Sequence, residues 1–202
     1  MFTEQEEQIL TYVMGLLHYY GAAYCSDLYE RVEEQLQVGW SKEDFHRLLE
    51  RTVLNDNHPY VMELEDEICF DFEVDDSEWV LAQQQQQAAL DFRPVNEREA
   101  ACLLEDRHLL LWSDSEEAFY AWLEARCDDS DLALTVFLEY ASLLKNGLTP
   151  LALAQKLVQQ LAVMQTEIQE VAELVLKFAA ATPMWTLKGW RPNELPLSSL
   201  VK

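Results

Sequence analysis

The stretch that decides the fold covers residues 60–73 and reads YVMELEDEICFDFE. Apolar side chains occupy every second position in each half of it, which is the period of a half-buried β-strand. These apolar positions are Tyr60, Met62, Leu64, Ile68, Phe70 and Phe72. The acidic link at residues 65–67 separates the halves, so the stretch is predicted to form a β-hairpin. If its apolar side packs inward, Glu63, Glu65, Asp71 and Glu73 share the outer face.

Three amphipathic segments precede this hairpin. The first begins at Thr3, which forms a capping box with Glu6, and ends at Gly21. The third begins at Ser41, a good N-cap residue. The inward faces of the second and third segments carry Leu28, Val32, Leu36, Phe45, Leu48, Leu49 and Val53. Three helices followed by a hairpin is the element order of a winged helix, so residues 1–80 are predicted to form a winged-helix-like module.

The second half of the chain is predicted to be helical throughout. A glutamine run lies within residues 81–95, which are interpreted as a junction between domains. Beyond it, Ser115 is expected to cap one helix and Thr149, followed by proline, another. Residues 96–202 are therefore expected to form a helical domain with a C-terminal docking tail. The predicted fold class is mainly α with a small β-hairpin, as a winged-helix-like module followed by an all-helical domain.

The composition limits the environment and the partners of the chain. Half of the 202 residues are apolar, enough for a core, and the formal charge is -23. Such a charge repels nucleic-acid phosphates and anionic lipid and suits a basic protein partner. The first residues lack the pattern of a signal peptide, and no apolar run is long enough to span a membrane. A cytoplasmic protein that does not bind membranes is expected, with its oligomeric state open.

The sequence contains no recognisable metal or catalytic site. Its cysteines are far apart and no histidine stands at ligand spacing from one of them, so reduced thiols and no metal are expected. The cysteines are Cys25, Cys69, Cys102 and Cys127, and the histidines are His18, His46, His58 and His108. G-x-S-x-G, H-E-x-x-H and glycine-rich phosphate loops do not occur. No enzyme activity and no cofactor are therefore expected.

The leading functional hypothesis is a non-catalytic protein that binds a basic partner through the acidic side chains of the hairpin. We call the set of acidic residues in the hairpin the acidic wing; it comprises Glu63, Glu65, Asp66, Glu67, Asp71 and Glu73. A well-solvated acidic face without a partner is the simpler interpretation of the same residues. A charge mimic that competes with nucleic acid for a basic protein is another interpretation.

A transcriptional regulator is the remaining alternative, because the third helix of a DNA-binding winged helix enters the major groove. The basic and titratable residues of that segment are Lys42, His46, Arg47 and Arg51. Three acidic residues in the same segment bring it close to neutral. An acidic wing opposes the phosphate contacts that provide most non-specific affinity, so nucleic acid is an unlikely partner.

The C-terminal segment carries a short motif, W-x-x-x-G-x-x-P-x-E-L. Its matching residues are Trp185, Gly189, Pro192, Glu194 and Leu195, with Trp190 between them. This tail, together with Tyr20-Gly21 and Leu28-Tyr29, resembles poorly characterised bacterial proteins related to the SEC-C motif-containing family. The resemblance implies a bacterial protein of no established activity. The cysteine-rich SEC-C motif does not follow Cys127, so metal binding is not implied. Packing of Trp185 and Trp190 onto the last helices is favoured over a partner-docking role.

Overall fold

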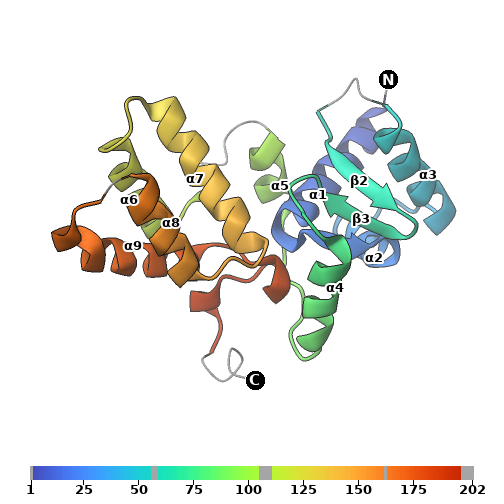
Figure 1. Ribbon diagram of the computed structural model, residues 1–202. Helices are drawn as coiled ribbons and strands as arrows, with labels where there is room; N and C mark the ends of the chain where they lie inside the picture. Colours follow the sequence, from blue (N-terminus) through green and yellow to red (C-terminus); the bar gives the residue numbers. More distant parts are fainter. Residues whose placement is uncertain (1, 56–58, 105–110, 162, 197–202) are drawn as a thin grey trace. The chain divides into compact units, whose positions relative to one another are not determined.

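The protein is mainly helical and contains a small three-stranded antiparallel sheet (Figure 1). The structure, a computed structural model, describes residues 2–55, 59–104, 111–161 and 163–196. The chain divides into two compact units, Met1–Leu111 and Trp112–Lys202, called here the first and the second unit. The predicted helical class and the hairpin are thus confirmed.

The first unit is built around its N-terminal helix. Its elements are α1 (Glu4–Tyr20), β1 (Ala22–Tyr24), α2 (Cys25–Leu36), α3 (Lys42–Val53), β2 (Met62–Glu65), β3 (Ile68–Asp71), α4 (Ser77–Gln86) and α5 (Glu97–Leu104). Helix α1 begins with the predicted capping box of Thr3 and Glu6, and α3 begins with the predicted cap of Ser41. Leu10, Val13 and other apolar residues of α1 are fully buried, which makes α1 the centre of the core.

The sheet has the order β1-β3-β2, with β3 in the middle. Its outer face carries two cross-strand rows, Tyr24–Ile68–Glu65 and Ala22–Phe70–Glu63. Its inner face carries Ala23–Cys69–Leu64 and the pair of Asp71 with Met62. The sequence did not predict β1, because a strand of three residues has too short a pattern to stand out and forms only by pairing with β3.

Residues 81–95, interpreted from the sequence as a junction, lie within the first unit. The glutamine run falls in α4, where the buried side-chain amide of Gln84 donates hydrogen bonds to the carbonyl oxygens of Tyr20 and Ala22. The hydroxyl group of Tyr20 donates in turn to the carbonyl of Arg93 at 2.6 Å. These bonds tie the stretch to the end of α1, so the division of the chain falls after α5 rather than before it.

Helix α5 packs closely on α1. A Cβ atom added at Gly15 of α1 would lie 2.4 Å from the Cβ and 2.7 Å from the Cα of Ala100. Real atoms do not approach to this distance, so the absence of a side chain at Gly15 is what permits the contact between the two backbones. Helix α5, predicted to open the second domain, therefore belongs to the first unit.

The second unit is helical throughout its described part. Its elements are α6 (Asp114–Glu124), α7 (Ser130–Lys145), α8 (Pro150–Gln160), the 3-10 turn η2 (Gln165–Glu167), α9 (Ile168–Ala181), and the 3-10 turns η3 (Trp185–Leu187) and η4 (Pro192–Glu194). The rings of Phe119 and Phe178 stack in its core, with their centres 4.2 Å apart. Thr149 caps α8 as predicted. The prediction for α6 is wrong by two residues: Ser113, not Ser115, forms the cap, because Glu116 completes a capping box with Ser113.

Candidate functional site

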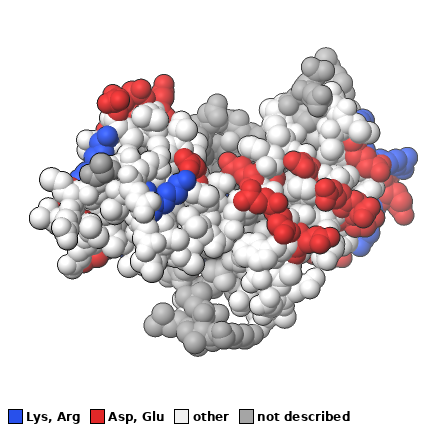
Figure 2. Space-filling view, in the orientation of Figure 1, with Lys and Arg blue, Asp and Glu red and all other residues white. Residues whose placement is uncertain are grey.

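Only some residues of the acidic wing are exposed to solvent. Glu63, Glu65, Asp66 and Glu67 are exposed, and we call these four residues the acidic hairpin surface. Glu73 is half-buried. Figure 2 shows acidic side chains gathered over the first unit, on the side that carries β2 and β3.

Asp71 was predicted to lie on the outer face, and this prediction is wrong, because Asp71 is buried. Asp71 ends β3, the middle strand of the sheet. It stands opposite Met62 of β2, so its side chain is on the same face of the sheet as this core residue. Its carboxylate accepts a hydrogen bond from the backbone N–H of Glu73 at 2.9 Å. The carboxylate of Asp71, the last residue of β3, therefore stabilises the turn that follows and does not contribute to a partner-binding surface.

The outer face of the sheet combines acid with apolar side chains. Glu63 pairs with Phe70 and Glu65 with Ile68, so no acidic residue of one strand stands opposite another. Tyr24, which flanks Ile68 on the other side, is 37% exposed. Carboxylates of neighbouring strands therefore do not repel one another across the ladder, and the face offers both negative charge and an exposed aromatic ring.

The basic residues predicted for DNA contact lie on α3, and each of them already has an acidic neighbour. Their partners are Glu30 for Lys42 at 3.5 Å, Glu50 for His46 at 3.5 Å, Asp44 for Arg47 at 2.6 Å and Glu6 for Arg51. The backbone N–H of Thr3 and the guanidinium of Arg51 lower the pKa of Glu6, which stays ionised. The exposed pairs among them, Lys42–Glu30 and Arg47–Asp44, are weak and are each worth up to about 1 kcal/mol. Together they leave α3 without an unbalanced positive face.

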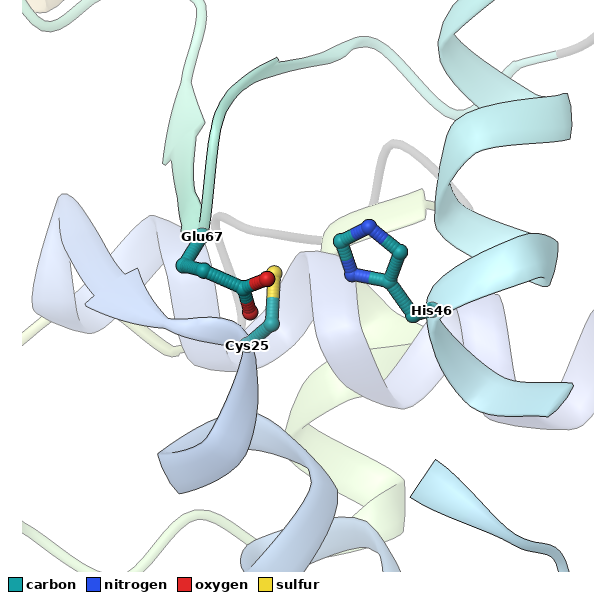
Figure 3. A group of neighbouring side chains, drawn as sticks. All are labelled: Cys25, His46 and Glu67. Carbon is teal, nitrogen blue, oxygen red and sulfur yellow. The ribbon is translucent and has the colours of Figure 1, made fainter. Parts of the chain in front are cut away.

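A second site, which the sequence did not predict, lies where α2, α3 and the hairpin turn meet. Cys25, His46 and Glu67 each direct one potential ligand atom to a common point, and these atoms lie within 4.8 Å of one another. Figure 3 shows the thiol, the carboxylate and the imidazole turned toward one another. The three residues line a cavity of about 570 Å³. Spacing along the sequence did not reveal this cluster, because the fold brings His46 to Cys25 from a distant part of the chain.

The thiol of this cluster is in its neutral form at physiological pH. Burial, and to a smaller extent the negative charges of Glu67 and Glu50, raise the pKa of Cys25 to about 11. A catalytic cysteine needs the opposite shift, because the thiolate is the nucleophile. The cluster as it stands is thus not arranged as a cysteine–histidine nucleophile.

We expect Cys25 to react slowly with iodoacetamide in the folded protein. With a pKa of about 11, roughly one thiol in a thousand is ionised at pH 8. Unfolding in urea restores an ordinary pKa, so labelling of Cys25 should accelerate by more than about 100-fold. Timed alkylation followed by peptide mass spectrometry measures both rates. Equal rates in the folded and unfolded states would contradict the assignment of a buried, protonated thiol.

The tail motif packs within the second unit. Trp185 is fully buried, and the ammonium group of Lys145 lies 5.5 Å from its ring centre. Arg191 pairs with the buried carboxylate of Glu116 at 3.2 Å. Gly189 has a φ of 85°, which a residue with a side chain rarely adopts. The remaining motif residues, Trp190, Pro192 and Glu194, lie in or beside η4. The burial of Trp185 agrees with the packing interpretation, whereas Trp190 is half-buried.

Among the described helices, none is both long enough and apolar enough to cross a membrane.

Comparison with protein-family models, curated proteins and solved structures finds no match to this chain. The resemblance to SEC-C-related proteins therefore stays a prediction.

Proposed function

We propose that the first unit is a winged-helix-like module that binds a basic protein partner and has no catalytic role. The element order α1-β1-α2-α3-β2-β3 and the sheet order β1-β3-β2 support the winged-helix assignment. In this assignment the β2–β3 hairpin is the wing and α3 is the helix that a DNA-binding relative would place in the major groove.

The acidic hairpin surface is the observation that carries this proposal. Glu63 and Glu65 project from the outer face beside Ile68 and the exposed ring of Tyr24. Aromatic residues are enriched in protein interfaces, and opposite charges around them steer the partners together. A partner that presents lysine or arginine between apolar side chains would complement this face.

The proposal is tested by neutralising acids on the hairpin and comparing the result with the same change elsewhere. The variant Glu63→Gln/Glu65→Gln is matched by Glu117→Gln/Glu170→Gln, whose residues are exposed on the second unit. The probe is a fluorescent peptide of alternating lysine and leucine, followed by anisotropy at several salt concentrations. We expect the hairpin variant to bind the peptide about three- to tenfold more weakly, because each ion pair between a hairpin glutamate and a peptide lysine is worth up to about 1 kcal/mol. An equal loss in both variants would mean that only net charge matters and would overturn the proposal.

The transcriptional-regulator alternative has a separate test. A labelled DNA duplex is titrated with the protein at low salt, where phosphate contacts are strongest. We expect no binding, because the basic residues of α3 are balanced by acids and the hairpin repels phosphate. Binding that is lost in Arg47→Ala and Arg51→Ala would favour the regulator instead. The charge-mimic alternative requires that duplex DNA competes with the chain for its basic partner.

A further inference from the structure

The cluster of Cys25, His46 and Glu67 is held together by the backbone of the first unit. The ladder between β1 and β3 ends at the pair of Tyr24 with Ile68. Immediately beyond it, the backbone N–H of Cys25 donates to the carbonyl oxygen of Glu67 at 2.8 Å. The start of α2 and the hairpin turn are therefore joined at the two residues whose side chains meet (Figure 3).

His46 is positioned by the residue before it. Phe45 is buried and packs edge-on against Tyr29 of α2, with ring centres 5.8 Å apart. This contact fixes α3 against α2 and directs the neighbouring imidazole to the cavity. The convergence of the three side chains thus follows from two contacts of the fold, one through the backbone and one through the core.

The imidazole is also oriented for binding. Its Nε2 atom lies 3.5 Å from the carboxylate of Glu50, and Figure 3 shows another ring nitrogen turned toward Cys25 and Glu67. A metal-binding histidine commonly donates its second N–H to a carboxylate, which sets the tautomer and leaves the first nitrogen free for the metal. Glu50 occupies the place of that supporting carboxylate.

The donor set and its geometry indicate which ion would fit. Sulfur, imidazole nitrogen and carboxylate oxygen are the three ligand types of zinc sites, at about 2.0–2.3 Å from the metal. Tetrahedral angles then place the ligand atoms roughly 3.3–3.8 Å apart. The atoms here lie within 4.8 Å, so closure by about an ångström is needed. Glu67 is exposed and His46 half-buried, so small rotations of these two side chains suffice while Cys25 stays in place.

The charges around the cluster favour a cation. Glu50 and Glu67 both act on the thiol of Cys25 with negative charge. The two basic residues that line the cavity, Lys42 and Arg47, pair with Glu30 and Asp44. A bound divalent ion would remove the repulsion among the acids and would hold the sulfur as a thiolate, releasing a proton on binding.

We propose that Cys25, His46 and Glu67 form a three-ligand zinc site, with Glu50 as its positioning residue and water from the cavity in the fourth coordination position. The site ties the start of α2, the middle of α3 and the hairpin turn to one ion. The site shares Glu67 with the acidic hairpin surface. The test of partner binding changes only Glu63 and Glu65, which are not ligands, so the two proposals can fail separately. Zinc is therefore expected to raise the melting temperature of the protein.

The test uses the metal-free, reduced full chain and Co²⁺ as a spectroscopic substitute for Zn²⁺. Because many exposed acids bind cations weakly, the decisive signal is the near-ultraviolet charge-transfer band of a cobalt–thiolate bond. We expect this band in the wild-type protein at one equivalent, its loss in Cys25→Ser, and its retention in Cys127→Ser. Loss in Cys127→Ser with retention in Cys25→Ser would overturn the assignment, as would the absence of any thiolate band.

Further variants keep the test independent of the folding of Cys25→Ser. Outer-shell partners of a metal typically contribute 10–100-fold to affinity. In competition with a chelating dye, His46→Ala and Glu67→Gln should therefore weaken Zn²⁺ binding by more than about 100-fold, and Glu50→Gln by about 10-fold. The control His18→Ala should leave the affinity unchanged. Circular dichroism confirms that each variant is folded, and unchanged affinity in both His46→Ala and Glu67→Gln would refute the site.

Discussion

Replacement of Trp185 by alanine is expected to lower the free energy of unfolding of the second unit by about 3–5 kcal/mol. Trp185 is the largest fully buried side chain of the molecule's described part, and it opens the 3-10 turn η3 that follows α9. Its removal leaves a cavity that rigid helices fill poorly, and it takes away the contact with Lys145. Hydrogen exchange of the α9 amides, measured with and without urea, reports the loss for this unit alone.

The control for this prediction is Leu151→Ala. Leu151 is 68% exposed on α8, so its truncation should change stability by less than about 0.5 kcal/mol. If Trp185→Ala proved as mild as this control, the tail would not be part of the core of the unit. A partner-docking role for the tail motif would then gain support.

Replacement of Gly15 by alanine is expected to destabilise the first unit by about 1–3 kcal/mol, although alanine is the better helix former. The new Cβ would meet both the side chain and the backbone of Ala100, and a backbone atom cannot rotate away. The gain in helix propensity of about 1 kcal/mol is smaller than the cost of pushing α5 off α1. Urea unfolding followed by circular dichroism measures the balance.

A double-mutant cycle with Ala100→Gly isolates the contact. Removal of the Ala100 Cβ eliminates the 2.4 Å approach but not the 2.7 Å approach to its Cα. We therefore expect the double variant to recover only part of the loss caused by Gly15→Ala. If Gly15→Ala were neutral or stabilising, the close approach of α1 and α5 would be refuted.

The Gly15 contact also explains why the domain boundary was hard to predict. A glycine inside a long helix usually has a packing reason, but the sequence does not name the partner. Ala100 lies far along the chain, beyond a glutamine run that reads as a linker. The small size of both residues is a signal that was present in the sequence, and only the fold connects them.

Several features were predictable because their causes are local. The caps at Thr3, Ser41 and Thr149 depend on side chains within three residues of a helix start, and each was predicted and confirmed. The same rule explains the error at Ser115, since Ser113 and Glu116 also match a capping box. Both strands of the β2–β3 hairpin were likewise visible as alternation around an acidic turn.

The orientation of β3 was not predictable from that alternation. Every residue from Cys69 to Asp71 is buried, so both faces of the sheet are covered at this end of β3. A pattern of period two shows which residues share a face but not which face meets the core when both are covered. The predicted outward position of Asp71 failed for this reason, whereas Glu63 and Glu65 on the edge strand are exposed as predicted.

The amino-acid sequence alone was sufficient to predict the helical class, the hairpin and the exposed acidic residues of its edge strand. Periodicity and capping depend on a few neighbouring residues, so they can be read without the tertiary structure. Only the tertiary structure revealed the cluster of Cys25, His46 and Glu67. These residues come from a helix start, a helix interior and a turn, and no short spacing connects them. Pairing of β1 with β3 and packing of α3 on α2 bring them together, and both depend on contacts between distant parts of the chain.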